Sequence, residues 1–88
     1  MDLGDAISII RKRKRITQKE LAGKCNLSVA ALSNIEKGKI IPSHQTIEAL
    51  AGEMGIQTAD LIMMTLAEAN ADLIKTSLFK KVLSLLKT

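Results

Sequence analysis

Cysteine, histidine and aromatic residues are almost absent from this sequence of 88 residues. The single cysteine, Cys25, excludes a disulfide within the chain, and one cysteine with one histidine cannot form a zinc site of several ligands. No Ser–His–Asp set, no pair of carboxylates on one helix face and no phosphate-binding glycine loop occurs in the sequence. We therefore expect neither an enzyme nor a protein with a metal or another cofactor.

Linkers rich in proline, glycine or serine, internal repeats and low-complexity runs are missing as well. A chain of this length forms one folded unit with a modest core. Because Phe79 is the only aromatic residue, the core has to consist of Leu, Ile, Ala and Met, which favour helices over sheet. The sequence therefore predicts an all-α fold.

The first residues, MDLGD, lack the basic and then apolar pattern of a signal peptide. A single cysteine also fits a reducing compartment. We therefore expect the protein in the cytoplasm, with no membrane partner.

Positive charge is concentrated in the first part of the chain. Residues 1–39 carry nine Lys or Arg and four Asp or Glu, a net charge of +5, whereas residues 40–70 carry four acids and no Lys or Arg. Residues 71–88 return to +3, from four Lys and one Asp. This distribution favours a polyanion as partner of the first 39 residues.

Residues 17–38, TQKELAGKCNLSVAALSNIEKG, are typical of two short helices joined by a tight turn. Thr17 can cap the first helix, with Glu20 completing a capping box. Asn26 tolerates the left-handed conformation that ends a helix and turns the chain. The buried face of the first helix would contain Leu21, Ala22 and Cys25.

The second helix of this unit would begin at Ser28, as its cap, and end at Gly38. Ala31, Leu32 and Ile35 share one face. The opposite face carries short or polar side chains that suit a helix lying in a DNA major groove. They are Val29, Ala30, Ser33, Asn34 and Lys37.

These 22 residues, followed by IPSHQTIEALAGEMGI, resemble the lambda-repressor/Cro (XRE) family of helix-turn-helix DNA-binding domains. The resemblance covers residues 3–64 and rests on the Thr-Gln pair before Leu-Ala, the Ser-x-x-x-Leu-Ser-x-Ile-Glu-x-Gly run and the later Pro-Ser. It implies a five-helix domain, which we place at residues 1–70. The family usually has glycine at the position of Asn26, and often at that of Arg15.

The resemblance also implies roles for individual residues. The third helix would lie in the major groove, with Val29, Ala30, Ser33 and Asn34 facing the bases and Ser28 near the backbone or a base. Gln18, exposed at the start of the second helix, would approach a phosphate, and Lys37 and Lys39 would bind phosphates, as could Lys19 and Arg15. Arg11 would form an internal ion pair with Glu36.

The side chains expected to face the bases can make only a few types of base contact. Asn34 can make a bidentate contact with adenine, and Val29 and Ala30 can contact thymine methyl groups. No Arg or Lys lies on the first turns of this helix to bind guanine. We therefore expect a half-site rich in A·T pairs, recognised partly through DNA shape.

The pattern predicts three further helices, which are the first, fourth and fifth of the domain. The first helix runs from Leu3 to about Arg13 and is capped by Asp2. Its apolar side is supplied by Ala6, Ile7, Ile9 and Ile10. The fourth is capped by Ser43 and ends near Met54, before Gly55. The fifth, ADLIMMTLAEA, would be capped by Thr58.

The basic run RKRKR at residues 11–15 and the lone histidine each have two interpretations. The run is either a phosphate-binding patch or the solvated, cation-rich end of a helix. We expect one or two of its five residues to contact DNA. His44 is either a solvated residue or a phosphate contact near the start of the fourth helix.

Residues 71–88 lie beyond the five helices of the family and show an amphipathic helical pattern. We expect a break near Asn70 rather than one long helix. The apolar side fits self-association, packing on its own domain or, least well, a membrane surface. We assign a homodimer interface to Met64, Leu78, Val82 and Leu86.

The sequence therefore predicts a DNA-binding transcriptional regulator, a repressor that binds a near-palindromic operator as a dimer. The alternative is an antitoxin-like module that keeps the helix-turn-helix shape and binds a protein through its apolar C-terminal helices.

Overall fold

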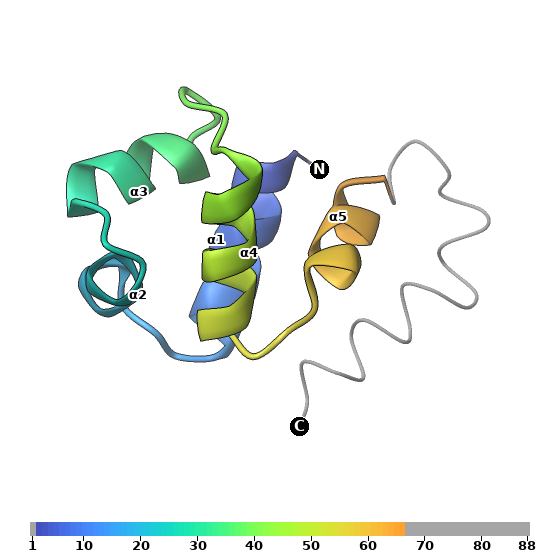
Figure 1. The fold of residues 1–88 in the computed structure, drawn as a ribbon, viewed down its shortest axis with the longest axis horizontal. Coiled ribbons are helices and arrows are strands. Elements are labelled where there is room, and N and C mark those ends of the chain that lie inside the picture. Colours follow the sequence, from blue (N-terminus) through green and yellow to red (C-terminus); the bar gives the residue numbers. More distant parts are fainter. Residues whose placement is uncertain (1, 67–88) are drawn as a thin grey trace.

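A computed structural model describes residues 2–66 of the chain. This part contains five α-helices and no strand, so the predicted all-α, five-helix class is confirmed (Figure 1). The predicted break near Asn70 and the C-terminal helix at residues 71–88 lie outside the described residues. The helices are α1 (Leu3–Arg13), α2 (Gln18–Lys24), α3 (Val29–Glu36), α4 (His44–Glu53) and α5 (Thr58–Leu66).

Four of the helices begin at the predicted caps. The side-chain oxygens of Asp2, Thr17, Ser28 and Ser43 each accept a hydrogen bond from the backbone N–H three residues on, at 2.8, 3.1, 3.0 and 3.2 Å. Thr58 differs, because it is the first helical residue of α5 and not its cap.

All four turns that connect the five helices use the left-handed backbone region. Arg15 and Asn26 have φ angles of 59° and 57°, and Gly38 and Gly55 have 76° and 74°. Asn26, Gly38 and Gly55 were expected to end helices in this way. Arg15 is less usual, since a long side chain is disfavoured in this region.

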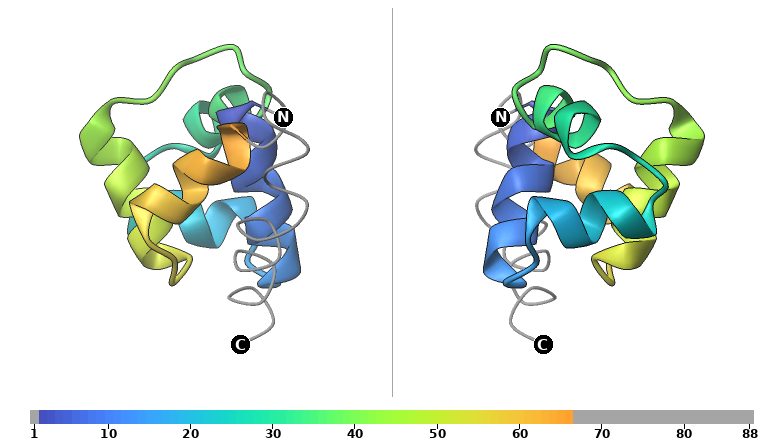
Figure 2. Two further views of the ribbon diagram at one scale, coloured as in Figure 1. Left: turned by 90° about the vertical axis from the view of Figure 1, so that its right-hand side faces the viewer. Right: turned by 90° about the vertical axis from the view of Figure 1, so that its left-hand side faces the viewer.

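The core lies between α1 and the other helices. Helix α1 packs against α3 and α5, while α2 packs against α3 and α4 (Figure 2). Of the four residues expected on the apolar side of α1, Ala6, Ile7 and Ile10 are fully buried, whereas Ile9 is only partly buried. The core residues are Ala6, Ile7, Ile10, Leu21, Ala22, Leu32, Ile35, Leu50, Ala51, Met54, Leu61 and Met64.

Met64 belongs to this core, with only 3% of its surface exposed. Its assignment to a dimer interface was therefore wrong, because the side chain is already covered within the domain. The other three residues of that assignment, Leu78, Val82 and Leu86, lie beyond the described part of the chain.

Gly4 marks a close approach between the first turn of α1 and the last turn of α3. A Cβ atom at this position would lie 2.3 Å from the backbone oxygen of Ile35 and 2.6 Å from that of Glu36. The partly positive start of α1 thus meets the partly negative end of α3. Only glycine permits this contact.

None of the helices in residues 2–66 has the length and apolar composition needed to cross a membrane.

Candidate nucleic-acid interface

The turn between α2 and α3 is fixed by backbone bonds. The N–H of Leu27 donates to the backbone oxygen of Ala22 at 2.8 Å, and the side chain of Leu27 packs against the core. Asn26, which lies between Ala22 and Leu27 in the chain, reverses the chain direction through its positive φ angle. Because both ends of the turn are held, α3 has a defined orientation on α2.

The outer face of α3 presents the short side chains that the sequence places there. Val29 is 44% exposed and Ala30 is exposed, while Ser33 and Asn34 are half-buried. On the inner face, Leu32 and Ile35 are buried. The helix therefore has one face in the core and one available to a ligand.

The loop after α3 is tied to its last turn. The backbone oxygen of Asn34 accepts hydrogen bonds from the N–H groups of Lys39 and Ile40, at 2.9 and 3.3 Å. The exposed residues Lys37 and Lys39 are thereby held close to the end of α3.

A buried ion pair joins α1 to α3. The Arg11 Nε donates to the Glu36 Oε2 at 2.8 Å and the Arg11 Nη2 to the Glu36 Oε1 at 3.1 Å, which is the pair that the resemblance implied. The Arg11 Nη1 also donates to the backbone oxygen of Ile16 at 2.9 Å. One guanidinium therefore connects α1, the loop before α2 and α3.

Gln18 is less exposed than the sequence predicts. Its side chain is half-buried, and its amide nitrogen donates to the Glu36 Oε1 at 3.1 Å. The sequence pattern did not reveal this bond, which fixes the first residue of α2 to the last residue of α3. The amide keeps a second N–H that can donate to another acceptor.

Burial alone would raise the pKa of the Glu36 carboxyl, because it disfavours the charged form. The hydrogen bonds from Arg11 and Gln18 and the positive charge of Arg11 outweigh burial and place this pKa below its usual value. Glu36 is therefore a carboxylate at neutral pH, and its charge is balanced within the domain.

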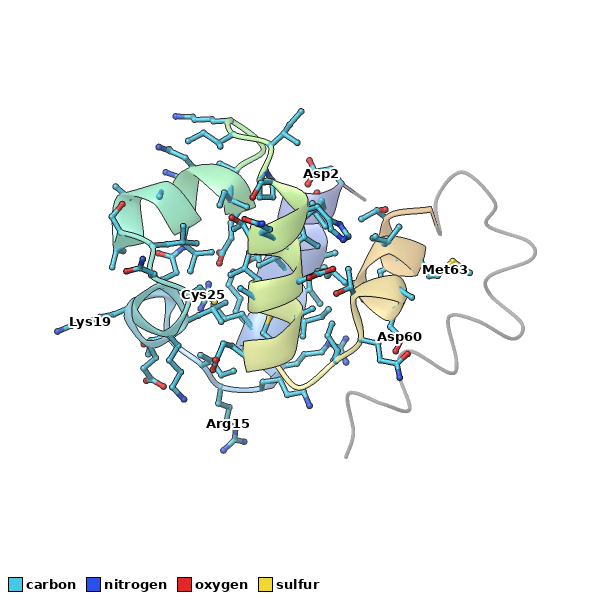
Figure 3. All side chains as sticks on the ribbon, viewed as in Figure 1. Asp2, Arg15, Lys19, Cys25, Asp60 and Met63 are labelled. Carbon is cyan, nitrogen blue, oxygen red and sulfur yellow. The ribbon has the colours of Figure 1, made fainter. Side chains whose placement is uncertain are left out.

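The remaining cations do not form one group. Arg15 points away from the protein at the opposite end of the molecule from the loop after α3, whereas Lys19 projects from α2 (Figure 3). His44 and Glu48 form an exposed pair at 2.7 Å on α4. The described residues thus bring Lys37 and Lys39 next to α3 and leave Arg15 remote from them.

Cys25 is half-buried at the end of α2, and burial together with the negative charge of Glu53 raises the pKa of its thiol. Among the described residues, no three His, Cys, Asp or Glu side chains gather in a way that could hold a metal ion.

Comparison with known proteins finds a helix-turn-helix family and relatives described as a repressor and a transcriptional regulator. The helix-turn-helix family model matches residues 7–61, which is more than half of the chain. The immunity repressor protein of Bacillus phage phi105 is 44% identical over 62 residues, which are 70% of this chain and 43% of that protein. The HTH-type transcriptional regulator DdrOP3 of Deinococcus deserti is 34% identical over 62 residues, 70% of this chain and 48% of that protein.

The fold is also similar to the crystal structure of the clp gene regulator ClgR from Corynebacterium glutamicum. The TM-score is 0.70 and the identity 29%, over 83% of each chain. The chain spans less than half the length of the two curated relatives above. On the match to the family model and the identity to the phage repressor, the chain belongs to the lambda-repressor/Cro-like family of helix-turn-helix DNA-binding domains.

Proposed function

We propose that this protein is a transcriptional regulator that binds a specific sequence of double-stranded DNA and represses transcription. The observation that carries the proposal is the outer face of α3, where Val29, Ala30, Ser33 and Asn34 lie beside the exposed Lys37 and Lys39. The named relatives, an immunity repressor and two regulators, support it.

Short side chains on α3 allow its backbone to come close to the base edges in a major groove about 12 Å wide. Val29 and Ala30 then offer apolar contacts to thymine methyl groups, and Asn34 can pair with adenine. Ser28 differs from these, since its hydroxyl already accepts the N–H of Ala31. It can still donate its own proton to a phosphate or a base.

Phosphate contacts would come from groups around the last turn of α3. The Gln18 amide donates one N–H to Glu36, the last residue of α3, and can donate the other to a phosphate oxygen. Lys37 and Lys39, which follow this turn, supply positive charge. The carboxylate of Glu36 does not repel the DNA strongly, because Arg11 neutralises it.

One domain of this size contacts only a few base pairs, so we propose a twofold dimer on a near-palindromic operator. Leu78, Val82 and Leu86 remain our candidates for the pairing residues. Leu78→Asp or Leu86→Asp should then give monomers in sedimentation equilibrium and weaken operator binding. An unchanged mass would contradict this interface without touching the DNA-binding proposal.

The experiment is selection of bound duplexes from random DNA, followed by fluorescence anisotropy at several salt concentrations. Asn34→Ala should cost about 1–3 kcal/mol on the selected sequence and much less on an unrelated duplex. Lys37→Ala should weaken binding to both duplexes and reduce the salt slope by about 1.

The matched control is Lys24→Ala, since Lys24 is exposed at the opposite end of α2 from Gln18. It should leave the salt slope nearly unchanged. Failure of the wild-type protein to bind any duplex in dilute salt would overturn the proposal. Tight binding to a protein partner without DNA binding would favour the antitoxin-like alternative.

A further inference from the structure

An apolar groove of about 290 Å³ lies between the first turn of α1 and the loop that follows α3. We call this site the α1–loop groove. Its only charged lining residue is Asp2, the cap of α1. The groove therefore offers a phosphate backbone no group of opposite charge, and an apolar side chain is the occupant that fits it. Its apolar lining is supplied by Leu3, Ile35, Ile40, Ile41 and Pro42.

Ile41 protrudes at the rim of this groove. It is 91% exposed, and its neighbour Ile40 is 45% exposed. Two adjacent isoleucines exposed beside an apolar groove are typical of a surface that another apolar group covers. Pro42 restricts the backbone of the residue before it, so Ile41 has few conformations to lose when it is bound.

A protruding side chain next to a groove makes this surface complementary to itself. A dry apolar cavity of about 150 Å³ holds benzene, so a groove of about 290 Å³ has room for the smaller side chain of an isoleucine. In a twofold contact the same patch of one copy meets that of the other. An axis that passes beside Ile41 therefore places this side chain of each copy in the groove of the other, and the contact closes at two copies.

Charge decides which end of the domain can meet its own copy. The charges that flank the groove balance, with two acids at the start of α1 and two lysines on either side of Gly38. They are Asp2, Asp5, Lys37 and Lys39. Arg15 lies at the opposite end of the molecule from Asp2 (Figure 3). It belongs to residues 12–15, which carry four positive charges and no acid, and this end would repel itself across a twofold axis.

We propose that the α1–loop groove binds Ile41 of a second copy of this chain when two copies occupy neighbouring half-sites on DNA. The inference rests on the DNA binding proposed above and adds a contact between the two bound domains. It does not involve Leu78, Val82 and Leu86, which remain candidates for a separate pairing contact.

A contact of this size can act on DNA although it is too small to hold a dimer in free solution. Two domains on one duplex are tethered to each other by the duplex. The tether gives each domain an effective concentration in about the millimolar range for the other. A weak contact can therefore couple the two binding events.

The test compares two duplexes. One carries a single selected half-site, and the other carries two as an inverted repeat about one helical turn apart. The measured quantity is the gain in apparent affinity from the first duplex to the second. Ile41→Ser should reduce this gain by a factor of about 5–150, the usual range for coupling between two sites. The control Ile62→Ser, at an exposed position of α5 outside the groove, should leave the gain unchanged.

A second measurement shows whether position 41 faces its own counterpart. Ile41→Lys and Ile41→Asp should each reduce the gain as Ile41→Ser does, because two like charges then meet near the axis. An equal mixture of the two variants should restore part of the gain, since opposite charges then meet. A mixture that is no more effective than either variant alone would overturn the proposal.

The remaining outcomes separate this inference from the proposed function. Because Ile41 is 91% exposed, Ile41→Ser should leave the Tm and the affinity for the single half-site unchanged. A lower Tm would show that the side chain is covered within its own chain, and a lower affinity for the single half-site would show that it contacts DNA. Either result, or an unchanged gain, would overturn this inference alone. Failure of the wild type to bind the single half-site would overturn the proposed function and this inference with it.

Discussion

Substitution of Glu36 by glutamine tests whether the buried ion pair holds α1, α2 and α3 together. The carboxylate accepts three hydrogen bonds, two from Arg11 at 2.8 and 3.1 Å and one from Gln18 at 3.1 Å. A glutamine side chain has one oxygen, so it can keep the bond from the Arg11 Nε, but its NH₂ group would face another donor. The Arg11 charge would also lose its partner in a site where both side chains are at most 10% exposed.

Removing one member of a buried pair costs about 3–5 kcal/mol, and the bond that glutamine keeps places Glu36→Gln at about 3 kcal/mol. For a domain of this size, that corresponds to a fall in Tm of roughly 12–24 °C. Thermal unfolding followed by circular dichroism at pH 7 measures it. The control is Glu48→Gln, which removes the exposed pair with His44 and should change stability by less than about 0.5 kcal/mol.

The dependence on pH provides an independent check. Because the pKa of Glu36 is lowered in the folded protein, its charge contributes stability above the ordinary value of 4.5, and this contribution is lost as the pH falls through the lowered pKa. Glutamine does not titrate. The difference in stability between wild type and Glu36→Gln should therefore shrink as the pH falls below 4.5. A constant difference, or none at pH 7, would refute the reasoning.

Two matched pairs of substitutions test the backbone. Gly4→Ala should destabilise the domain by at least about 2 kcal/mol in urea unfolding, because the new Cβ would collide with backbone oxygens of α3. Gly52→Ala, whose Cβ meets nothing within 4 Å in α4, should instead stabilise by about 0.5–1 kcal/mol, and equal effects of the two would contradict the close approach. Arg15→Gly should stabilise by about 0.5–1 kcal/mol by relieving a φ angle of 59°, while Arg13→Gly in the last turn of α1 should destabilise by about 1 kcal/mol. Equal signs for the two arginine variants would show that the left-handed turn carries no strain.

Much of the fold was predictable because its signals are local. The caps at Asp2, Thr17, Ser28 and Ser43 each act on an N–H three residues away, so the pattern along the chain contains the whole interaction. The exposure of Val29 and Ala30 follows in the same way from the helical period of α3.

The contacts that sequence reasoning missed join residues far apart in the chain. Gln18 and Glu36 are 18 residues apart, and Gly4 meets the end of α3 across 31 or more residues. No periodicity within one helix indicates such pairs. The place of Met64 was missed for a related reason, since α5 carries more apolar residues than one buried face needs, and only the packing against α1 and α4 selects among them.

The division of α3 into a buried and an outward face has a consequence for how such a domain can diversify. Val29 and Ala30 contribute little to the core, so replacing them changes the surface offered to a ligand at little cost in stability. Asn34 is less free, because its backbone anchors the following loop. A library randomised at positions 29, 30 and 33 should therefore yield mostly folded proteins with altered ligand preferences. The domain would then serve as a practical scaffold for new binding specificities.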